Sequence, residues 1–200
     1  MLDRLKFAGA PVVVTGGGQG IGRATCEVLA ELEAHVIVVS RTAANVDETV
    51  AILQAAGAFC EGHVADVSSL EEVEALAARV AERHDSVKAV VNNAGTNRPK
   101  HVLEVTEEDY DAVMDLNLKS AFFTAKAAAS RMAEQNVKGS LIHLGSQMGH
   151  VGGENRSLYC ASKWALEGFN KSLALDLSPH GIRSNIIAPT FIETPLTSSF

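Results

Sequence analysis

Short, almost continuously apolar runs alternate along this chain with longer segments of helical periodicity, and this alternation restricts the possible fold more than any other feature. The runs cover residues 11–15, 36–39, 87–91, 140–144 and 182–187, with a weaker run at 59–64. Runs without a polar face are typical of strands that are covered on both faces of a parallel sheet. The sequence therefore predicts parallel strands with helices packed on both sides.

The segments between the runs carry the signals of helices. Helices are predicted over 21–32, 44–56, 68–84, 106–136 and 157–177. Ser68 and Glu71 have the spacing of a capping box, and Thr106 and Asp109 open the next helix in the same way. Strands and helices that alternate through right-handed crossovers give a Rossmann-type, doubly wound parallel sheet in three layers, α/β/α. We expect one dinucleotide-binding domain over residues 1–200.

Charge and cysteine content exclude several classes of protein. The net charge of −7 disfavours nonspecific binding to nucleic acid or to an anionic membrane. No apolar run approaches a membrane span, and the charged N-terminus does not resemble a signal peptide. Three cysteines without metal-type spacing, Cys26, Cys60 and Cys160, indicate reduced thiols. We expect a cytoplasmic protein with no metal site and with no nucleic-acid or membrane partner.

A glycine-rich turn joins the first apolar run directly to the first predicted helix. Gly16, Gly20 and Gly22, with Gln19 and Ile21 between them, have the context that a phosphate-binding turn requires. Small residues let the backbone approach a pyrophosphate, and the helix N-terminus offers N–H donors with a partial positive charge. The turn predicts a dinucleotide bound at the carboxyl ends of the strands, where ligands of doubly wound sheets lie.

Tyr159 and Lys163 lie four residues apart in the last long helical segment, so their side chains share one helix face. A nearby ammonium favours the phenolate and lowers the pKa of a phenol from its ordinary value of about 10. Tyr159 would then act as the general base in alcohol oxidation and as the general acid in ketone reduction. Ser146, which follows the predicted strand at 140–144, is placed to donate a hydrogen bond to the substrate oxygen.

In their order and spacing these motifs resemble the short-chain dehydrogenase/reductase family, over most of the chain. The motifs are Thr15-Gly16-x-x-x-Gly20-x-Gly22, Asn92-Asn93-Ala94-Gly95, Ser146 and Tyr159-x-x-x-Lys163. The resemblance implies an NAD(P)-dependent oxidoreductase that transfers a hydride between nicotinamide and a secondary alcohol or ketone. It implies that Lys163 also binds the nicotinamide ribose and that an asparagine holds a water in a proton relay. The implied catalytic residues are Asn117, Ser146, Tyr159 and Lys163.

The end of the second predicted strand bears on the choice of cofactor. Ser40 and Arg41 stand where a carboxylate would bind the 2′-hydroxyl of NAD, and Arg41 can pair with a 2′-phosphate. We therefore expect NADP(H) to be preferred, with NAD(H) possible. The segment 188–195 resembles the one that closes over the nicotinamide in the family, with Thr190 in place of glycine. The expected cofactor-binding residues are Gly16, Gln19, Gly20, Ile21, Gly22, Ser40, Arg41, Asp66, Val67, Asn93, Ala94, Gly95, Tyr159, Lys163, Pro189, Ile192 and Thr194.

The segment between Ser146 and Tyr159 should line the substrate cleft, and it is polar. This polarity favours a polyol, sugar or sugar-acid substrate, as for the gluconate 5-dehydrogenases of the family. The expected substrate contacts are Ser146, Gln147, His150, Arg98 and Tyr159. Two alternatives stay open. One is a 3-oxoacyl-[acyl-carrier-protein] reductase, with an acidic carrier bound at Arg98, Lys100, Lys126 and Arg131. The other is a dinucleotide-binding sensor without catalysis.

The sequence ends at Phe200, whereas members of the family usually continue through a substrate-covering segment, a further helix and a seventh strand. We therefore expect that the C-terminal helix and seventh strand of the family domain are missing. For the full-length protein we expect a homotetramer or a homodimer.

Overall fold

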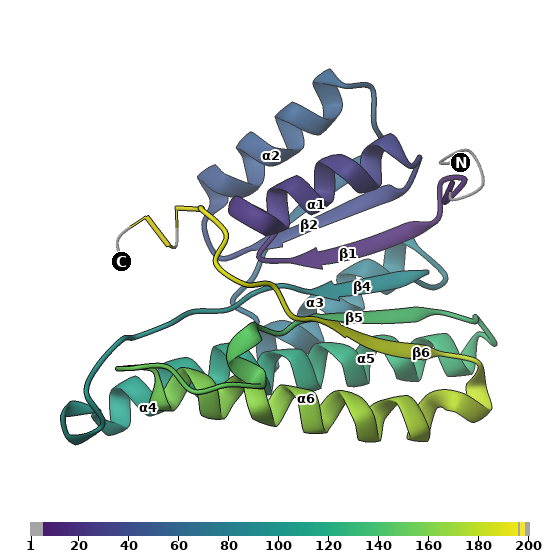
Figure 1. The fold of residues 1–200 in the computed structure, drawn as a ribbon. Helices are drawn as coiled ribbons and strands as arrows, with labels where there is room; N and C mark the ends of the chain where they lie inside the picture. Colours follow the sequence, from purple (N-terminus) through teal and green to yellow (C-terminus); the bar gives the residue numbers. More distant parts are fainter. Residues whose placement is uncertain (1–5, 196, 199–200) are drawn as a thin grey trace.

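The computed structural model describes residues 6–195 and 197–198, and it contains all six predicted strands (Figure 1). The strands are β1 (Pro11–Thr15), β2 (His35–Ser40), β3 (Cys60–Val64), β4 (Ala89–Asn92), β5 (Ser140–Leu144) and β6 (Arg183–Ile187). The α-helices are α1 (Gly20–Glu31), α2 (Ala43–Ala55), α3 (Leu70–Arg83), α4 (Glu107–Met114), α5 (Ser120–Glu134) and α6 (Ser157–Leu177). The predicted elements are thus confirmed, with ends that differ by one or a few residues.

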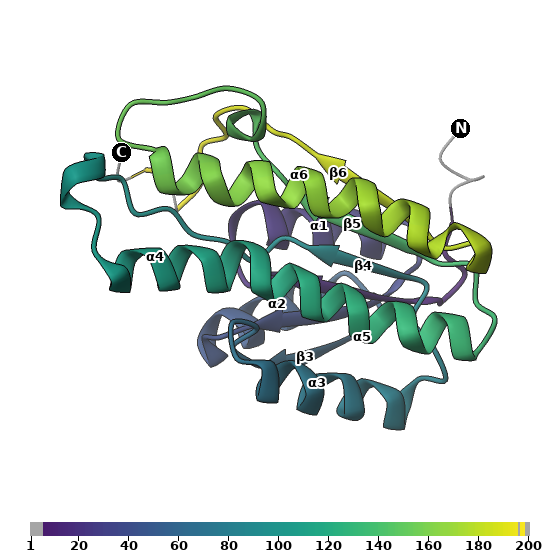
Figure 2. The ribbon, with the colours of Figure 1, turned by 90° about the horizontal axis from the view of Figure 1, so that it is seen from below.

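The six strands form one parallel sheet in the order β3-β2-β1-β4-β5-β6. Helices α1 and α2 cover one face, and α3, α5 and α6 cover the other (Figures 1 and 2). The strand order reverses between β1 and β4, so the chain leaves these neighbouring strands toward opposite faces. That reversal opens a crevice at the carboxyl ends of the strands, which lie on the left in Figure 1. The predicted Rossmann-type architecture is confirmed.

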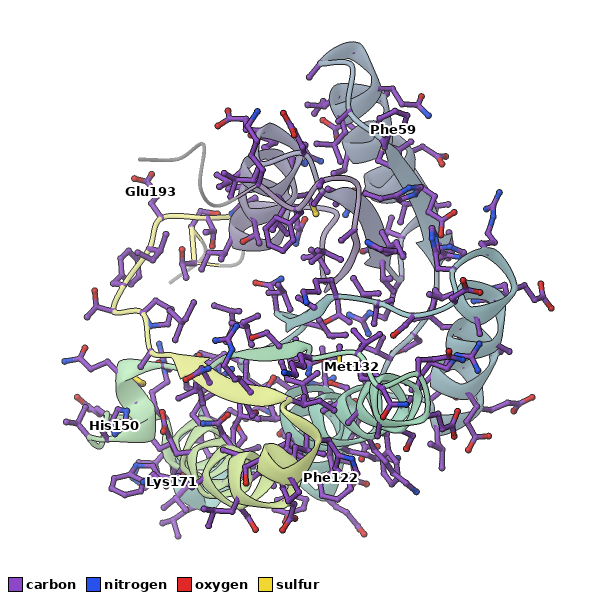
Figure 3. The ribbon with its side chains drawn as sticks, turned by 90° about the vertical axis from the view of Figure 1, so that its right-hand side faces the viewer. Phe59, Phe122, Met132, His150, Lys171 and Glu193 are labelled. Atoms are coloured by element: carbon purple, nitrogen blue, oxygen red, sulfur yellow. The ribbon has the colours of Figure 1, made fainter. Side chains whose placement is uncertain are left out.

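Each face of the sheet has its own apolar core because successive residues of a strand point to opposite sides. Val13, Ile37 and Met132 belong to the core beneath α3 and α5, whereas Val12 and Leu53 belong to the core beneath α1 and α2. The side chain of Met132 is fully buried and lies in the interior in Figure 3. Two buried faces explain why the strands read as continuous apolar runs rather than as an alternating pattern.

The helix predicted over 106–136 is interrupted by one wide turn. Thr106 and Asp109 form the expected reciprocal capping box at its start, and residues 115–119 then form a π-helix between α4 and α5. The other predicted capping box is wrong by one residue, because Ser69 rather than Ser68 accepts a hydrogen bond from a helical N–H, that of Glu72. None of the described helices combines the length and apolar character needed to cross a bilayer.

Candidate active site

One cleft at the carboxyl ends of the strands gathers most of the predicted site residues. It is lined by the glycine-rich turn, the ends of β2 and β4, Ser146, Tyr159, Lys163 and the segment after β6. Of the seventeen predicted cofactor contacts, only Asp66 is absent from the lining of this cleft. The yellow segment after β6 runs along the same end of the sheet in Figure 1.

The glycine-rich turn is compact because its backbone packs against itself and against β4. Gly16 has a φ of +65°, and a Cβ on Gly22 would overlap the Gly16 carbonyl and stand 2.5 Å from the Asn93 amide nitrogen. Asn93 Nδ2 donates to the carbonyls of Thr15 at 3.0 Å and of Gly16 at 3.1 Å. These bonds tie the end of β1 to the end of β4 and hold the crevice in shape.

The start of α1 fits the phosphates of a dinucleotide. Gln19, the N-cap residue, makes no side-chain cap, and the first turn of α1 contains no acidic residue. The N–H groups at a helix start have no partners within the helix, and together they carry a partial positive charge. A pyrophosphate would satisfy these donors, and Gly16, Gly20 and Gly22 let it come close to the backbone.

Lys163 is buried beside Tyr159 on α6. Its side chain is only 5% exposed, and Nζ lies 5.6 Å from the centroid of the Tyr159 ring. The ammonium donates a 2.7 Å hydrogen bond to the carbonyl of Leu144, at the end of β5. Burial lowers the pKa of Lys163 to about 8. The predicted pairing of these two side chains on one helix face is confirmed.

The pKa of Tyr159 departs from the sequence-based prediction. Burial raises the pKa of the phenol, while a hydrogen bond from Ser146 and the charge of Arg156 act in the opposite direction without offsetting it. The pKa of the phenol is thus raised rather than lowered in this structure, and the Lys163 ammonium donates its hydrogen bond to Leu144. A protonated phenol is the form that a general acid requires.

Ser146, two residues after the end of β5, caps a single 3-10 turn, η4 (Gln147–Gly149). Its Oγ accepts a 3.1 Å hydrogen bond from the N–H of Met148, so the hydroxyl hydrogen is left to donate elsewhere. The N–H of Gln147, which directly follows Ser146, donates to the carbonyl of Pro189 at 2.9 Å. This contact joins the Ser146 loop to the segment that follows β6.

Asn117 lies in the π-helical turn and is 2% exposed. Its amide nitrogen donates to the Thr96 carbonyl at 2.9 Å and to Ser162 Oγ at 3.0 Å, and its amide oxygen accepts from the Thr96 N–H at 2.7 Å. Thr96 lines the cleft, whereas Asn117 does not. The side chain of Asn117 therefore holds the loop after β4 against α6.

The predicted substrate contacts divide into two groups. Ser146 and Tyr159 line the cleft, but Gln147, His150 and Arg98 are absent from its lining. His150 lies at the periphery of the molecule in Figure 3, where Nε2 is 3.0 Å from a carboxylate oxygen of Glu167. Arg98 lies 3.1 Å from Asp109 and 3.3 Å from Glu108, at the start of α4.

At the end of β2, Arg41 lines the cleft with a side chain that is 60% exposed. The nearest carboxylate oxygen belongs to Asp66, at 3.7 Å. Asp66 accepts hydrogen bonds from the N–H and the hydroxyl of Ser68. Burial by itself raises the pKa of Asp66, but the bonds from Ser68 and the charge of Arg41 hold that pKa below its ordinary value.

The sequence analysis missed several residues that line the cleft. They are Val39, Thr42, Asn45, Ala65, Thr96, Leu116, Leu144, Gly145, Thr190, Pro195 and Thr197. Ala65 and Gly145 directly follow predicted strands, which is a signal that could have identified them. Asn45 lies inside α2 and belongs to no motif. Thr190 has no left-handed backbone, so threonine is accommodated without strain where the family has glycine.

This chain matches known proteins over nearly its whole length. The family model described as short chain dehydrogenase matches residues 10–200. The 3-oxoacyl-[acyl-carrier-protein] reductase FabG of Escherichia coli is 34% identical, over 96% of this chain and 78% of that protein. The galactitol 2-dehydrogenase of Rhizobium johnstonii is also 34% identical, over 97% of this chain and 76% of that protein.

A solved structure matches at the level of the fold as well. It is described as a putative NAD(P)-dependent gluconate 5-dehydrogenase from Beutenbergia cavernae with bound NADP at low occupancy. It superposes with a TM-score of 0.92 at 31% identity, over 98% of this chain and 77% of that chain.

Proposed function

This chain belongs to the short-chain dehydrogenase family and is an NAD(P)-dependent oxidoreductase, and on that premise we propose that its substrate is a polyol, sugar or sugar acid. The reaction moves a hydride between nicotinamide and a secondary alcohol or ketone. The relatives are named as dehydrogenases and reductases, which supports an enzyme over the alternative of a non-catalytic sensor.

One observation carries the catalytic assignment: a single cleft joins the glycine-rich turn to Ser146, Tyr159 and Lys163. We propose that the start of α1 binds the pyrophosphate and that Lys163 binds the nicotinamide ribose. When bound, the nicotinamide supplies or accepts the hydride. The dinucleotide and the reacting carbon would then share this cleft with the only described tyrosine and lysine that line it.

We propose that Tyr159 gives a proton to the substrate oxygen in reduction and takes it back in oxidation. Ser146 donates a hydrogen bond to the same oxygen, because its own Oγ is already oriented by the N–H of Met148. Lys163 places a positive charge beside the phenol. Asn117 is proposed as a member of the catalytic set that positions Thr96 and the helix turn carrying Tyr159.

Two observations support a polyol, sugar or sugar acid over an acyl-carrier thioester. One relative acts on galactitol and one structural neighbour is described as a gluconate 5-dehydrogenase, by their names. Recognition of an acidic carrier would need free cations beside the cleft, yet two of the four candidate cations, Arg98 and Lys100, are both paired with Asp109. The similarity to 3-oxoacyl-[acyl-carrier-protein] reductases keeps that activity as the second candidate.

The substrate proposal is tested by following nicotinamide absorbance with NADPH and a panel of substrates. The panel contains keto-sugars, keto-gluconates and an acetoacetyl thioester. Turnover of a sugar or sugar acid with little turnover of the thioester is the expected result. Turnover of the thioester alone would overturn the sugar proposal and assign the chain to acyl reduction.

We propose that NADP(H) is preferred over NAD(H), because Arg41 lines the cleft at the end of β2 and no carboxylate of β2 competes there. A single contact between a guanidinium and a phosphate is worth about 1.5–3 kcal/mol, which is roughly 10-fold to 150-fold in affinity. Asp66, at 3.7 Å, holds Arg41 only loosely, so the guanidinium can turn toward a 2′-phosphate.

Replacing Arg41 with Asp should reverse this preference, since a carboxylate repels a 2′-phosphate and binds the 2′-hydroxyl of NAD. We expect the ratio of KM for NADPH to KM for NADH to rise at least about 10-fold. The matched control is Arg79→Asp, the same charge change on the exposed face of α3. An unchanged ratio in the Arg41 variant would contradict the assignment.

We also propose that the protein is cytoplasmic and that its full-length form is a homotetramer or homodimer. The three free cysteines support a reducing compartment. Exposed aromatic side chains on α4, α5 and α6 support assembly through these helices. They are Tyr110, Phe122 and Trp164. The described residues are consistent with one domain, built on one sheet.

A further inference from the structure

The end of the sheet opposite the cleft carries a cluster of metal-ligating side chains that the proposed function does not use. His35 is the first residue of β2, Glu61 lies near the start of β3, and His84 directly follows α3. One potential ligand atom from each residue lies within 4.8 Å of the other two. The three residues come from three separate elements and lie far apart in the sequence, so no sequence motif predicts the cluster.

The fold itself brings these three side chains together. β2 and β3 are parallel, with Ile37 opposite Glu61, so His35, Ile37 and Glu61 point to the same face of the sheet. Helix α3 packs on that face through its apolar residues and delivers His84 at its C-terminal end. The rings of His35 and His84 meet edge to face, with centroids 4.7 Å apart.

Glu61 is the centre of the cluster. One of its oxygens lies 3.1 Å from Nε2 of His63 and 3.2 Å from Nε2 of His84, and the other lies 3.0 Å from the Arg83 guanidinium. The side chains of Glu61 and His84 are only 12% and 13% exposed. Arg83 balances the carboxylate from the solvent side, where it is 63% exposed.

His35 supplies the atom that these contacts leave unexplained. Its Nε2 is buried and has no hydrogen-bond partner among the described residues. A buried polar atom without a partner is unfavourable and is rare in folded proteins. A ring nitrogen that is shielded from solvent, beside a carboxylate and a second imidazole, has the surroundings of a metal ligand.

We propose that His35, Glu61 and His84 bind one divalent metal ion and that this ion is Zn²⁺. Two imidazoles and one carboxylate suit Zn²⁺, whereas Mg²⁺ and Ca²⁺ prefer oxygen ligands. Ligand atoms about 2.0–2.2 Å from zinc lie roughly 3.3–3.5 Å apart in a tetrahedral site, so small side-chain rotations close the cluster. His84 would exchange its hydrogen bond to Glu61 for the metal, and water would take the fourth position. This site departs from the expectation of no metal in the sequence analysis.

The site has a structural role, because it lies at the amino ends of the strands and away from the cleft. β3 is an edge strand of the sheet and pairs only with β2 among the described strands. A metal held by β2, β3 and the end of α3 would fasten that edge to the helix that covers it. The Arg83 contact to the second carboxylate oxygen would remain and would orient Glu61.

The test is a titration of the EDTA-treated full chain with Zn²⁺ alone, by isothermal titration calorimetry, with Mg²⁺ as the comparison ion. We expect one Zn²⁺ per chain and a rise in Tm on zinc addition. Loss of an outer-shell partner already weakens metal binding about 10-fold to 100-fold, so His35→Gln and His84→Gln should each weaken it at least about 100-fold. His180→Gln, at an exposed histidine, is the matched control and should bind zinc like the unmodified chain.

If either variant fails to fold, the unmodified chain is titrated with Co²⁺ instead, because the visible spectrum of bound Co²⁺ reports which ligand types hold the metal. Visible bands of a four-coordinate nitrogen and oxygen site, without a thiolate charge-transfer band, would support the proposal. A thiolate band would assign the metal to cysteine and overturn it. Absence of saturable zinc binding, or unchanged affinity in both folded variants, would overturn it as well.

Discussion

Replacing Tyr159 with Phe should lower kcat by about 10²–10⁴-fold and leave the affinity for NADPH nearly unchanged. The substitution removes only the hydroxyl that is proposed to give or take the proton, while the ring keeps its place on α6 beside Lys163. Turnover is measured by nicotinamide absorbance, and NADPH affinity by fluorescence titration of the same preparation.

The chain provides its own control, because it contains one other tyrosine. Tyr110 lies on α4, is 52% exposed and is absent from the cleft lining, so Tyr110→Phe should keep full turnover. Normal turnover by the Tyr159 variant would refute the proposed proton transfer. An equal loss in both variants would point to a general effect on the protein instead.

Replacing Gly22 with Ala should weaken dinucleotide binding and destabilise the fold. The new Cβ would overlap the Gly16 carbonyl and stand 2.5 Å from Asn93 Nδ2, so the turn must open or the end of β4 must move. Overpacking of this kind raises the free energy of the folded state by about 1–3 kcal/mol, which corresponds to a fall in Tm of roughly 2–12 °C. We expect NADPH affinity to fall at least about 10-fold, measured by fluorescence titration beside thermal unfolding.

The matched substitution is Gly168→Ala on the exposed side of α6. A Cβ there meets no atom within 4 Å, and alanine is favoured over glycine inside a helix by about 1 kcal/mol. We expect NADPH affinity to be retained and Tm to be unchanged or higher. If the Gly22 variant bound NADPH as tightly as the Gly168 variant, the packing of the turn could not be what shapes the phosphate site.

The fold was predictable because each strand is buried on both faces and therefore leaves a continuous apolar run. The run at 11–15 became β1, and the glycine-rich turn that follows it lies in the cleft at the carboxyl ends of the strands. The π-helical turn at 115–119 was not predictable, since nothing in its composition distinguishes it from the α-helix on either side. Its geometry depends on contacts that Asn117 makes with Thr96 and Ser162, far away in the sequence.

The site was predictable where function depends on residue type and local spacing, as for Tyr159 and Lys163. The candidate site was not predictable where the partner of a side chain depends on residues that are far away in the sequence. His150 looked available to a substrate, but it is absent from the cleft lining and its Nε2 lies 3.0 Å from a carboxylate oxygen of Glu167 on α6. The proposed metal cluster is of the same kind, because His35 and His84 meet only after α3 folds across the sheet.

The wide turn around Asn117 also bears on how the gene can vary. A π-helical turn holds one residue more than the same arc of α-helix, so 115–119 contains a surplus residue in the middle of a long helical rod. Deleting a single codon there would leave a regular α-helix whose two halves keep nearly the same faces, because the surplus residue is absorbed within the π-helical turn. Such a mutant would keep the packing of α4 and α5 but lose the wide turn from which Asn117 holds Thr96. Selection on this segment therefore acts on its length as well as on its amino acids.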